Sequence, residues 1–418
     1  MINRRGFVAG ATLATVSMPT IVRAQAVKDV VIGALYPLSG ASAQIGVDAK
    51  HAFETALDII NGDHPDLDLP GAKGNGLAGL GGAKLRIVYA DHQGDPQKGR
   101  AEAERIITQE KVSALGGTYQ SAVAATVSQT AERYAVPFLS ADNSSPSLHR
   151  RGLKYFFRAA AHDEIFSANM FDFLDSMRKR GEKVDSVALF YEDTIFGTDS
   201  SNVQRKLAGE RGYKIASDIK YRANTPSLTA EVQQLKAGGA DVLLPCSYTT
   251  DSILLVKTMN DLGYKPKAIV AQAAGFAEQA FYDAVGSQVE NAITRASFSL
   301  DLAEKRPVVG KVNALFKARS GKDLNDNTSR ELMAVLILAD AIDRAKSTEG
   351  TKVRDALAAT NIPGEKTIMP WKKVAFDETG QNRDGDAVLL QYKGGSKFVT
   401  IFPESVAVAQ ATWPMSKS

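Results

Sequence analysis

Short apolar runs alternate with longer amphipathic segments along the chain from residue 28 onward. The apolar runs are rich in β-branched residues and are bounded by Gly, Asp or Ser, which is typical of strands buried on both faces. Strands that alternate with helices indicate βαβ units and a mostly parallel sheet. The first series of predicted strands covers 30–36, 85–90, 112–115 and 137–140, with helices over 45–60, 101–109 and 122–134.

A second series of the same kind follows Phe156-Phe157-Arg158. Because 418 residues exceed the size of a single compact core, two series predict an α/β fold with two doubly wound, Rossmann-like lobes. The second series has predicted helices over 164–180, 200–211, 227–237 and 250–262, predicted strands over 186–191, 214–221, 241–245 and 268–271, then helices 305–320 and 329–345 and a strand-rich end, 366–402.

Two local patterns have a structural explanation. The segment 64–82, rich in Gly, Pro and Asp, is predicted to be a surface loop. It contains a GxGxxG spacing, but a dinucleotide site needs this motif between a strand and a helix, so no cofactor is expected. Thr328 and Glu331 have the Thr-x-x-Glu spacing of a capping box and are predicted to begin the helix over 329–345.

The N-terminus has the pattern of an export signal. Arg4 and Arg5 precede a mild apolar stretch that ends in small residues, so residues 1–26 are predicted to be a signal peptide of either the twin-arginine or the Sec type. Without this leader, Lys+Arg falls from 50 to 47 and equals the 47 Asp+Glu. The mature chain is therefore expected to be a neutral periplasmic protein with no nucleic-acid partner.

The sequence lacks the usual catalytic and metal-binding signatures. It has no GxSxG, Walker A, HExxH or paired CxxC motif, and its five histidines lack ligand spacing. The one cysteine, Cys246, is interpreted as a small buried thiol, with a nucleophile as the alternative. We therefore expect a protein that is not an enzyme and uses no metal or cofactor.

Polar and aromatic residues follow the predicted strands at their carboxyl ends, where open α/β sheets bind ligands. In the first lobe, Tyr119-Gln120-Ser121 and Asp142-Asn143-Ser144 lie in such loops, where hydroxyls and helix N–H groups hold a carboxylate. The alternative is that these side chains are only helix caps. In the second lobe, Phe196 and Tyr248 are expected to cover an apolar ligand body or, alternatively, to pack the lobes together.

Taken together, these stretches resemble the type I periplasmic solute-binding proteins of ABC importers, in the family that includes branched-chain amino acid (Leu/Ile/Val) receptors. The resemblance covers nearly all of residues 28–402. Its markers are residues 31–34, 38–40, 44–46, 91–96, 116–121, 137–146, 157–158, 191–193, 196–197 and 376–380.

The resemblance implies a hinged clamshell with three crossovers, placed near 158–162, 289–292 and 360–368. The first lobe would comprise 27–159 plus 291–362, and the second 160–290 plus 363–418. It also implies a monomer that captures a small solute and delivers it to an inner-membrane ABC permease with its ATPase. A sensory receptor of the same fold is the alternative, and a cleft hydrolase is a further one.

The resemblance also implies roles for single residues. Ser121 and Ser144 match hydroxyls that hold an amino acid's carboxylate and amine, and Asp142 and Asn143 add backbone contacts. Ile45, Phe196 and Tyr248 match aromatic residues around the ligand. The predicted ligand-binding set is Ile45, Tyr119, Gln120, Ser121, Asp142, Asn143, Ser144, Phe196, Tyr248 and Gln272.

One departure bears on the ligand. Amino-acid receptors of the family place a glutamate after the strand that ends here near Ala271, where it pairs with the ammonium group. This chain has Gln272-Ala273-Ala274-Gly275 instead. Burying an ammonium group without a carboxylate costs several kcal/mol. The expected solute is therefore an amino acid or, equally, a small uncharged or acidic molecule, including organic and aromatic acids.

Overall fold

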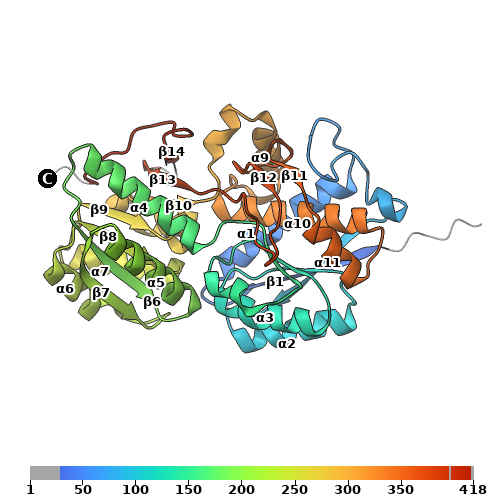
Figure 1. The fold of residues 1–418 in the computed structure, drawn as a ribbon, viewed down its shortest axis with the longest axis horizontal. Helices are drawn as coiled ribbons and strands as arrows, with labels where there is room; N and C mark the ends of the chain where they lie inside the picture. The colour runs from blue at the N-terminus through green and yellow to red at the C-terminus, as the bar shows by residue number, and fades with distance from the viewer. Residues whose placement is uncertain (1–28, 395–396, 416–418) are drawn as a thin grey trace, which may run out of the picture.

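The computed structural model describes residues 29–394 and 397–415, which form two α/β lobes lying side by side (Figure 1). Each lobe has its own sheet, so the predicted fold class is confirmed. The predicted signal peptide, residues 1–26, lies outside the described residues. Within the described ranges, we find no helix with both the length and the apolar character needed to cross a membrane.

The first lobe is built on a five-stranded parallel sheet in the order β2-β1-β3-β4-β5. Its interior strand β1 has the sequence VVIGALY and is buried at all but its second position, as expected of a strand covered on both faces. The lobe contains β1 (Val30–Tyr36), β2 (Leu85–Asp91), β3 (Leu115–Gly117), β4 (Phe138–Ser140), β5 (Phe156–Arg158), α1 (Ala43–Asn61), α2 (Pro96–Gln109), α3 (Ser121–Arg133), α9 (Pro307–Ser320), α10 (Asp326–Ala345) and α11 (Gly350–Ala358).

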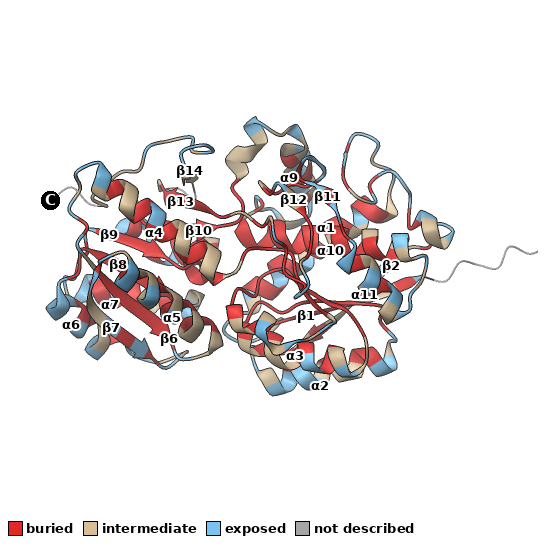
Figure 2. Ribbon diagram, viewed as in Figure 1, coloured by how far each residue is buried: buried red, intermediate tan, exposed pale blue. Residues whose placement is uncertain are grey.

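Helix α10 lies in the core of the first lobe, between α1 and α11. Its residues 326–339 are all buried, which Figure 2 shows as a red helix inside the lobe. The helix is capped by Asn325, whose side-chain oxygen accepts from the Thr328 N–H at 2.9 Å while the Thr328 hydroxyl accepts from the Asn325 N–H at 2.9 Å. The predicted pairing of Thr328 with Glu331 is wrong, because Glu331 is buried in the lobe.

The second lobe is built on a seven-stranded sheet in the order β14-β13-β10-β9-β8-β6-β7. β13 is antiparallel to both of its neighbours, and the strands from β10 to β7 are parallel. The lobe contains β6 (Ser186–Glu192), β7 (Lys214–Tyr221), β8 (Val242–Cys246), β9 (Ala268–Ala271), β10 (Ile293–Ala296), β13 (Val388–Tyr392), β14 (Phe398–Phe402), α4 (Asp163–Lys179), α5 (Ile195–Glu210), α6 (Thr229–Gly238), α7 (Thr249–Asp261) and α8 (Gln279–Val285).

The chain crosses between the lobes three times, at 159–162, 297–299 and 382–387. The first crossing lies where it was predicted. The second lies after the predicted 289–292, because β10 still belongs to the second sheet. The third lies after the predicted 360–368, because the short pair β11 (Ile362–Pro363) and β12 (Lys373–Val374) still packs on the core of the first lobe. The second and third crossings therefore lie at 297–299 and 382–387, later in the chain than the predicted lobe boundaries at 291 and 362.

The segment 64–82 is only partly the predicted surface loop. Its residues Leu67, Leu69, Ala72 and Leu77 are buried in the core of the first lobe. The Gly79 N–H donates to the Asp343 carboxylate near the end of α10. These four buried apolar side chains therefore attach the segment to the first lobe, although its Gly and Pro content indicates a loop exposed to solvent.

Candidate ligand-binding site

A pocket between the lobes is lined by residues from both of them and encloses a cavity of about 20 Å³. That is room for about one water molecule, so the wall side chains nearly fill the space between the lobes at this point. Six of the ten predicted ligand-binding residues line it. The first lobe contributes Tyr119, Ser121, Asp142, Ser144, Asn327 and Arg330, and the second contributes Phe196, Tyr248, Ala274 and Arg295.

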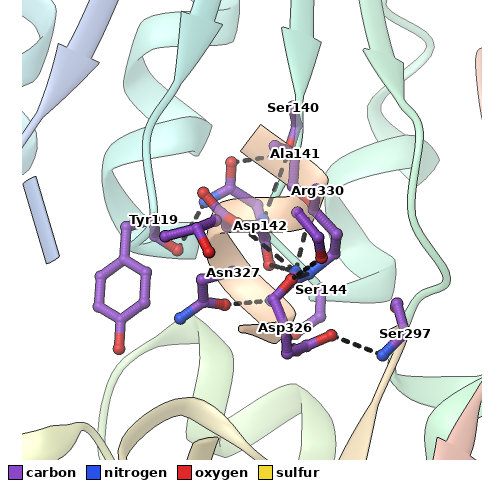
Figure 3. Close-up of polar contacts among 12 residues, drawn as sticks. Tyr119, Ser140, Ala141, Asp142, Ser144, Ser297, Asp326, Asn327 and Arg330 are labelled. Atoms are coloured by element: carbon purple, nitrogen blue, oxygen red, sulfur yellow. Dashed lines mark hydrogen bonds and ion pairs between the residues drawn. The ribbon is translucent and has the colours of Figure 1, made fainter. Parts of the chain in front are cut away.

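The loop between β3 and α3 places Tyr119 and Ser121 in the pocket wall. Tyr119 has φ = 71°, a left-handed conformation that bulky residues rarely adopt. Asn143 holds this loop: its Nδ2 donates to the Tyr119 carbonyl at 2.9 Å, and its Oδ1 accepts from the Ser140 hydroxyl at 2.8 Å (Figure 3). Asn143 therefore positions the wall instead of lining it.

Arg330 on α10 fixes the loop that follows β4. Its Nη1 donates to the carbonyls of Ala141 and Asp142 at 3.2 and 3.3 Å. Its Nη2 pairs with the Asp326 carboxylate at 2.9 Å and also donates to the Asn327 side chain (Figure 3). The loop that carries Asp142 and Ser144 is thus tied to the central helix of the lobe.

In the second lobe, Phe196 lies in the first turn of α5. The helix begins at Ile195, before the predicted start at residue 200, because the Glu192 carboxylate accepts from the N–H groups of Thr194 and Gly197 at 2.5 and 2.7 Å. An added Cβ at Gly197 would lie 2.1 Å from the Glu192 carbonyl oxygen. Only glycine therefore allows this turn, which directs Phe196 to the pocket.

Three aromatic rings span the interface between the lobes at the pocket. The ring centroid of Tyr248 lies 5.4 Å from that of Tyr119 and 5.3 Å from that of Phe196, within the range of favourable ring pairs. The rings line the pocket and also pack the lobes together, and the covering of an apolar ligand body by Phe196 and Tyr248 stays a prediction.

Four predicted ligand-binding residues lie away from the pocket wall. Ile45 packs in the core of the first lobe, and Asn143 supports the Tyr119 loop. Gln120 donates to the Ser42 hydroxyl at 3.3 Å and makes no capping hydrogen bond. Gln272 is fully buried in the second lobe, where its side chain donates to Asp163 at 2.9 Å and accepts from Gln204 at 3.1 Å.

The segment after β9 contributes backbone atoms to the pocket wall and no charged side chain. Ala273 and Ala274 both have positive φ, 51° and 48°, and this turn places Ala274 in the wall. The next acidic residue along the chain is Glu278, which is buried and accepts a hydrogen bond from the Asn327 side chain of the first lobe. This segment therefore contributes backbone and the methyl group of Ala274 to the wall, and no carboxylate.

Four wall residues were not predicted: Ala274, Arg295, Asn327 and Arg330. Three of them come from β10 and α10, which are far along the chain, and sequence order could not show that these elements return to the pocket. The available signal was a charged residue within an apolar stretch. Arg295 is a charged residue within the buried strand ITRA, and Arg330 and Glu331 are charged residues near the start of the buried helix α10.

Several acidic groups at the pocket hold protons more tightly than usual. Burial raises the pKa of Asp142 and, more strongly, that of Glu331, whose two carboxyl oxygens have no hydrogen-bond partner among the described residues. Burial, with the nearby Asp48, raises the pKa of Glu278 to about 8. Glu278 therefore keeps its proton at neutral pH and adds little negative charge to the pocket.

Cys246 is fully buried, as interpreted, and burial raises the pKa of its thiol. Since the thiolate is the reactive form, this side chain is unsuited to nucleophilic chemistry. Within the described ranges, no three His, Cys, Asp or Glu side chains are grouped so that they could hold a metal ion. The chemistry that the pocket offers is hydrogen bonding, charge pairing and aromatic contact.

The fold and this pocket define a two-lobed binding protein. The chain belongs to the periplasmic binding protein family, whose model matches residues 29–397, and the resemblance seen in the sequence is thereby confirmed. A Leu/Ile/Val-binding protein homolog of Brucella suis is 29% identical over 94% of this chain and 96% of its own length.

Two solved structures illustrate the range of similar proteins. A leucine binding protein from Thermotoga maritima has a TM-score of 0.75 and 21% identity, covering 90% of this chain and 99% of that chain. An ABC transporter solute binding protein from Rhodopseudomonas palustris, in complex with 3,4-dihydroxy benzoic acid, has a TM-score of 0.70 and 14% identity, covering 91% and 94%. These similarities show the type I periplasmic binding fold.

Proposed function

We propose that this protein is the periplasmic substrate-binding component of an ABC importer, which captures one small polar or carboxylated solute between its lobes and delivers it to a membrane permease. One observation carries the proposal: a pocket whose wall comes from both lobes presents hydroxyl groups, aromatic rings and a buried arginine. A solute that contacts both lobes stabilises the closed arrangement selectively, which is how such a receptor signals that it is loaded.

Known ligands of similar proteins support a small solute without fixing its identity. The names of the relatives and neighbours include Leu/Ile/Val-binding proteins, a leucine binding protein and a complex with dihydroxy benzoic acid. These ligands share a carboxyl group and an apolar body. The hydroxyls of Ser121 and Ser144 and the rings of Tyr119, Tyr248 and Phe196 suit both parts.

A thermal-shift screen tests solute capture, with amino acids, aromatic acids, short aliphatic acids, amides and polyols as probes. A solute at a hundred times its Kd should add about 2.7 kcal/mol of stability. Phe196→Ala should weaken the binding of any hit, whereas Tyr134→Ala, outside the pocket, should not. Delivery is tested by reconstituting the permease and ATPase encoded by neighbouring genes in vesicles and measuring uptake of a solute that this protein binds. The absence of uptake would refute the transport role.

A further inference from the structure

Three buried arginines lie around the pocket, and two of them are tied to the protein by several hydrogen bonds each. Arg330 donates to the backbone carbonyls of Ala141, Asp142 and Asp326 and to the side chains of Asp326 and Asn327, so all three of its nitrogens are in use. Arg158 donates to Gln381 at 2.7 Å and to the carbonyls of Asn143 and Ser145 at 3.0 and 2.8 Å, and it does not line the pocket.

Arg295 differs from them. It is 3% exposed, lines the pocket, and has a buried Nε with no hydrogen-bond partner. Its one side-chain hydrogen bond crosses to the Ser144 hydroxyl of the first lobe at 3.3 Å. The nearest carboxylate atoms, on Asp163 and Asp326, lie 3.7 and 4.0 Å away, beyond hydrogen-bond distance. An arginine has five donors, so most of the donors of Arg295 remain unused.

This guanidinium is held in place by an aromatic ring and by ion pairs with Asp163 and Asp326 that are longer than hydrogen bonds. Its central carbon lies 3.8 Å from the ring centroid of Phe166, close enough for a cation–π interaction. The strand β10 that carries it pairs with β9 on one side and β13 on the other. A rigid, buried cation with unused donors costs free energy unless an anion reaches it.

The surroundings of Arg295 offer further donors, and the one carboxyl group among the wall residues, that of Asp142, already lies beside another guanidinium. Ser121, at the N-terminus of the thirteen-residue helix α3, and Ser144 face the same pocket. The carboxylate of Asp142 lies 3.6 Å from the Arg330 guanidinium, and its Oδ2 accepts from the Tyr36 hydroxyl at 3.0 Å, while its Oδ1 has no hydrogen-bond partner among the described residues. Glu278 is occupied with Asn327.

We propose that the solute is a small carboxylate without an ammonium group, and that Arg295 binds this carboxylate as its counter-ion in the wall of the second lobe. This inference rests on the proposed function. A guanidinium fork matches a carboxylate with two parallel hydrogen bonds. Ser144, already bonded to Arg295, and Ser121 then hold the same group from the first lobe, so that the carboxylate joins the two lobes.

Matched sets of probes test the inference on the full-length exported protein. Each set has one apolar body and three head groups: 4-methylpentanoate, its amide and leucine; 3-phenylpropanoate, its amide and phenylalanine. Calorimetry should show that the acid of at least one set binds at least about thirtyfold more tightly than its amide and its amino acid, as expected for a buried charge pair. Tighter binding of the amide or the amino acid overturns the inference.

Variants at Arg295 complete the test. Arg295→Met should reduce carboxylate affinity by at least about thirtyfold and leave amide affinity unchanged, and Arg295→Lys should fall between the two proteins. Unchanged carboxylate affinity in Arg295→Met would overturn the inference. If that variant fails to fold, the comparison of head groups in the unmodified protein still decides. If no probe in a wider screen of anions, neutral molecules and zwitterions binds, solute capture itself fails, and the inference with it.

Discussion

Glu278 offers the sharpest test of the electrostatics, because a substitution with glutamine keeps its size and its hydrogen bond. The side chain is buried between the lobes and accepts from the Asn327 amide. Burial raises the pKa of Glu278 from 4.5 to about 8. Glu278→Gln replaces a carboxyl group that must release its proton above that pH with a neutral acceptor that never titrates.

The expected difference in stability follows from the linkage between proton binding at Glu278 and unfolding. An unfolded chain releases this proton near pH 4.5, whereas the folded protein keeps it until about pH 8. Between these values unfolding releases a proton, so the free energy of unfolding falls as pH rises, by about 1.36 kcal/mol per pH unit. The stability advantage of Glu278→Gln over the unmodified protein should thus be near zero at pH 4.5 and about 3 kcal/mol at pH 7, with little increase above pH 8.

Urea unfolding measured at several pH values provides the assay. The two tryptophans report on different lobes, since Trp371 packs in the core of the first lobe and Trp413 packs against Phe173 in the second. All other titrating groups are common to both proteins, so the difference between the two curves isolates Glu278. A difference that stays constant between pH 5 and pH 8 would refute a buried, proton-holding carboxyl group at this position.

Three further predictions concern the pocket and its support. Asn143→Ala leaves the loop of Tyr119 without its side-chain hydrogen bonds, so unfolding free energy should fall by about 2–3 kcal/mol in urea titrations, and the affinity for any captured solute should fall with it. Gly197→Ala should lower both quantities, because a Cβ would overlap the Glu192 carbonyl, whereas Gly209→Ala in the same helix meets no atom within 4 Å and should leave affinity unchanged. The Cys246 thiol should not react with Ellman's reagent at pH 8 in the folded protein and should react fully in urea; a fast native reaction would contradict its burial.

The sequence predicts the sheets well because their strands are continuous apolar runs. Strands β1, β7 and β9 begin and end at the predicted residues, and the alternation of strand and helix gave the fold class. The residues at the carboxyl ends of β3, β4, β6 and β8 supplied six of the pocket's ten wall residues, since a parallel sheet brings these ends together.

The remaining wall residues depend on contacts that no local pattern records. Arg295 and Arg330 reach the pocket because β10 and α10 return to it after long excursions of the chain. The polar residues Gln120, Asn143 and Gln272 lie in loops at the carboxyl ends of strands. The side-chain amide of each donates a hydrogen bond to a neighbouring side chain or backbone group instead of facing the pocket. Which of two adjacent polar residues faces a ligand depends on side-chain direction, as Tyr119 with its positive φ shows.

The late position of α10 has a consequence for how the protein is made. The first lobe begins with β1 at Val30, yet the helix that fills its core ends only at Ala345, more than four-fifths of the way along the 418 residues. A chain emerging from the ribosome therefore lacks a finished first lobe through most of its synthesis. The second lobe is finished later still, because its strands β13 and β14 end only at Phe402, so neither lobe is complete until nearly the whole chain has been made.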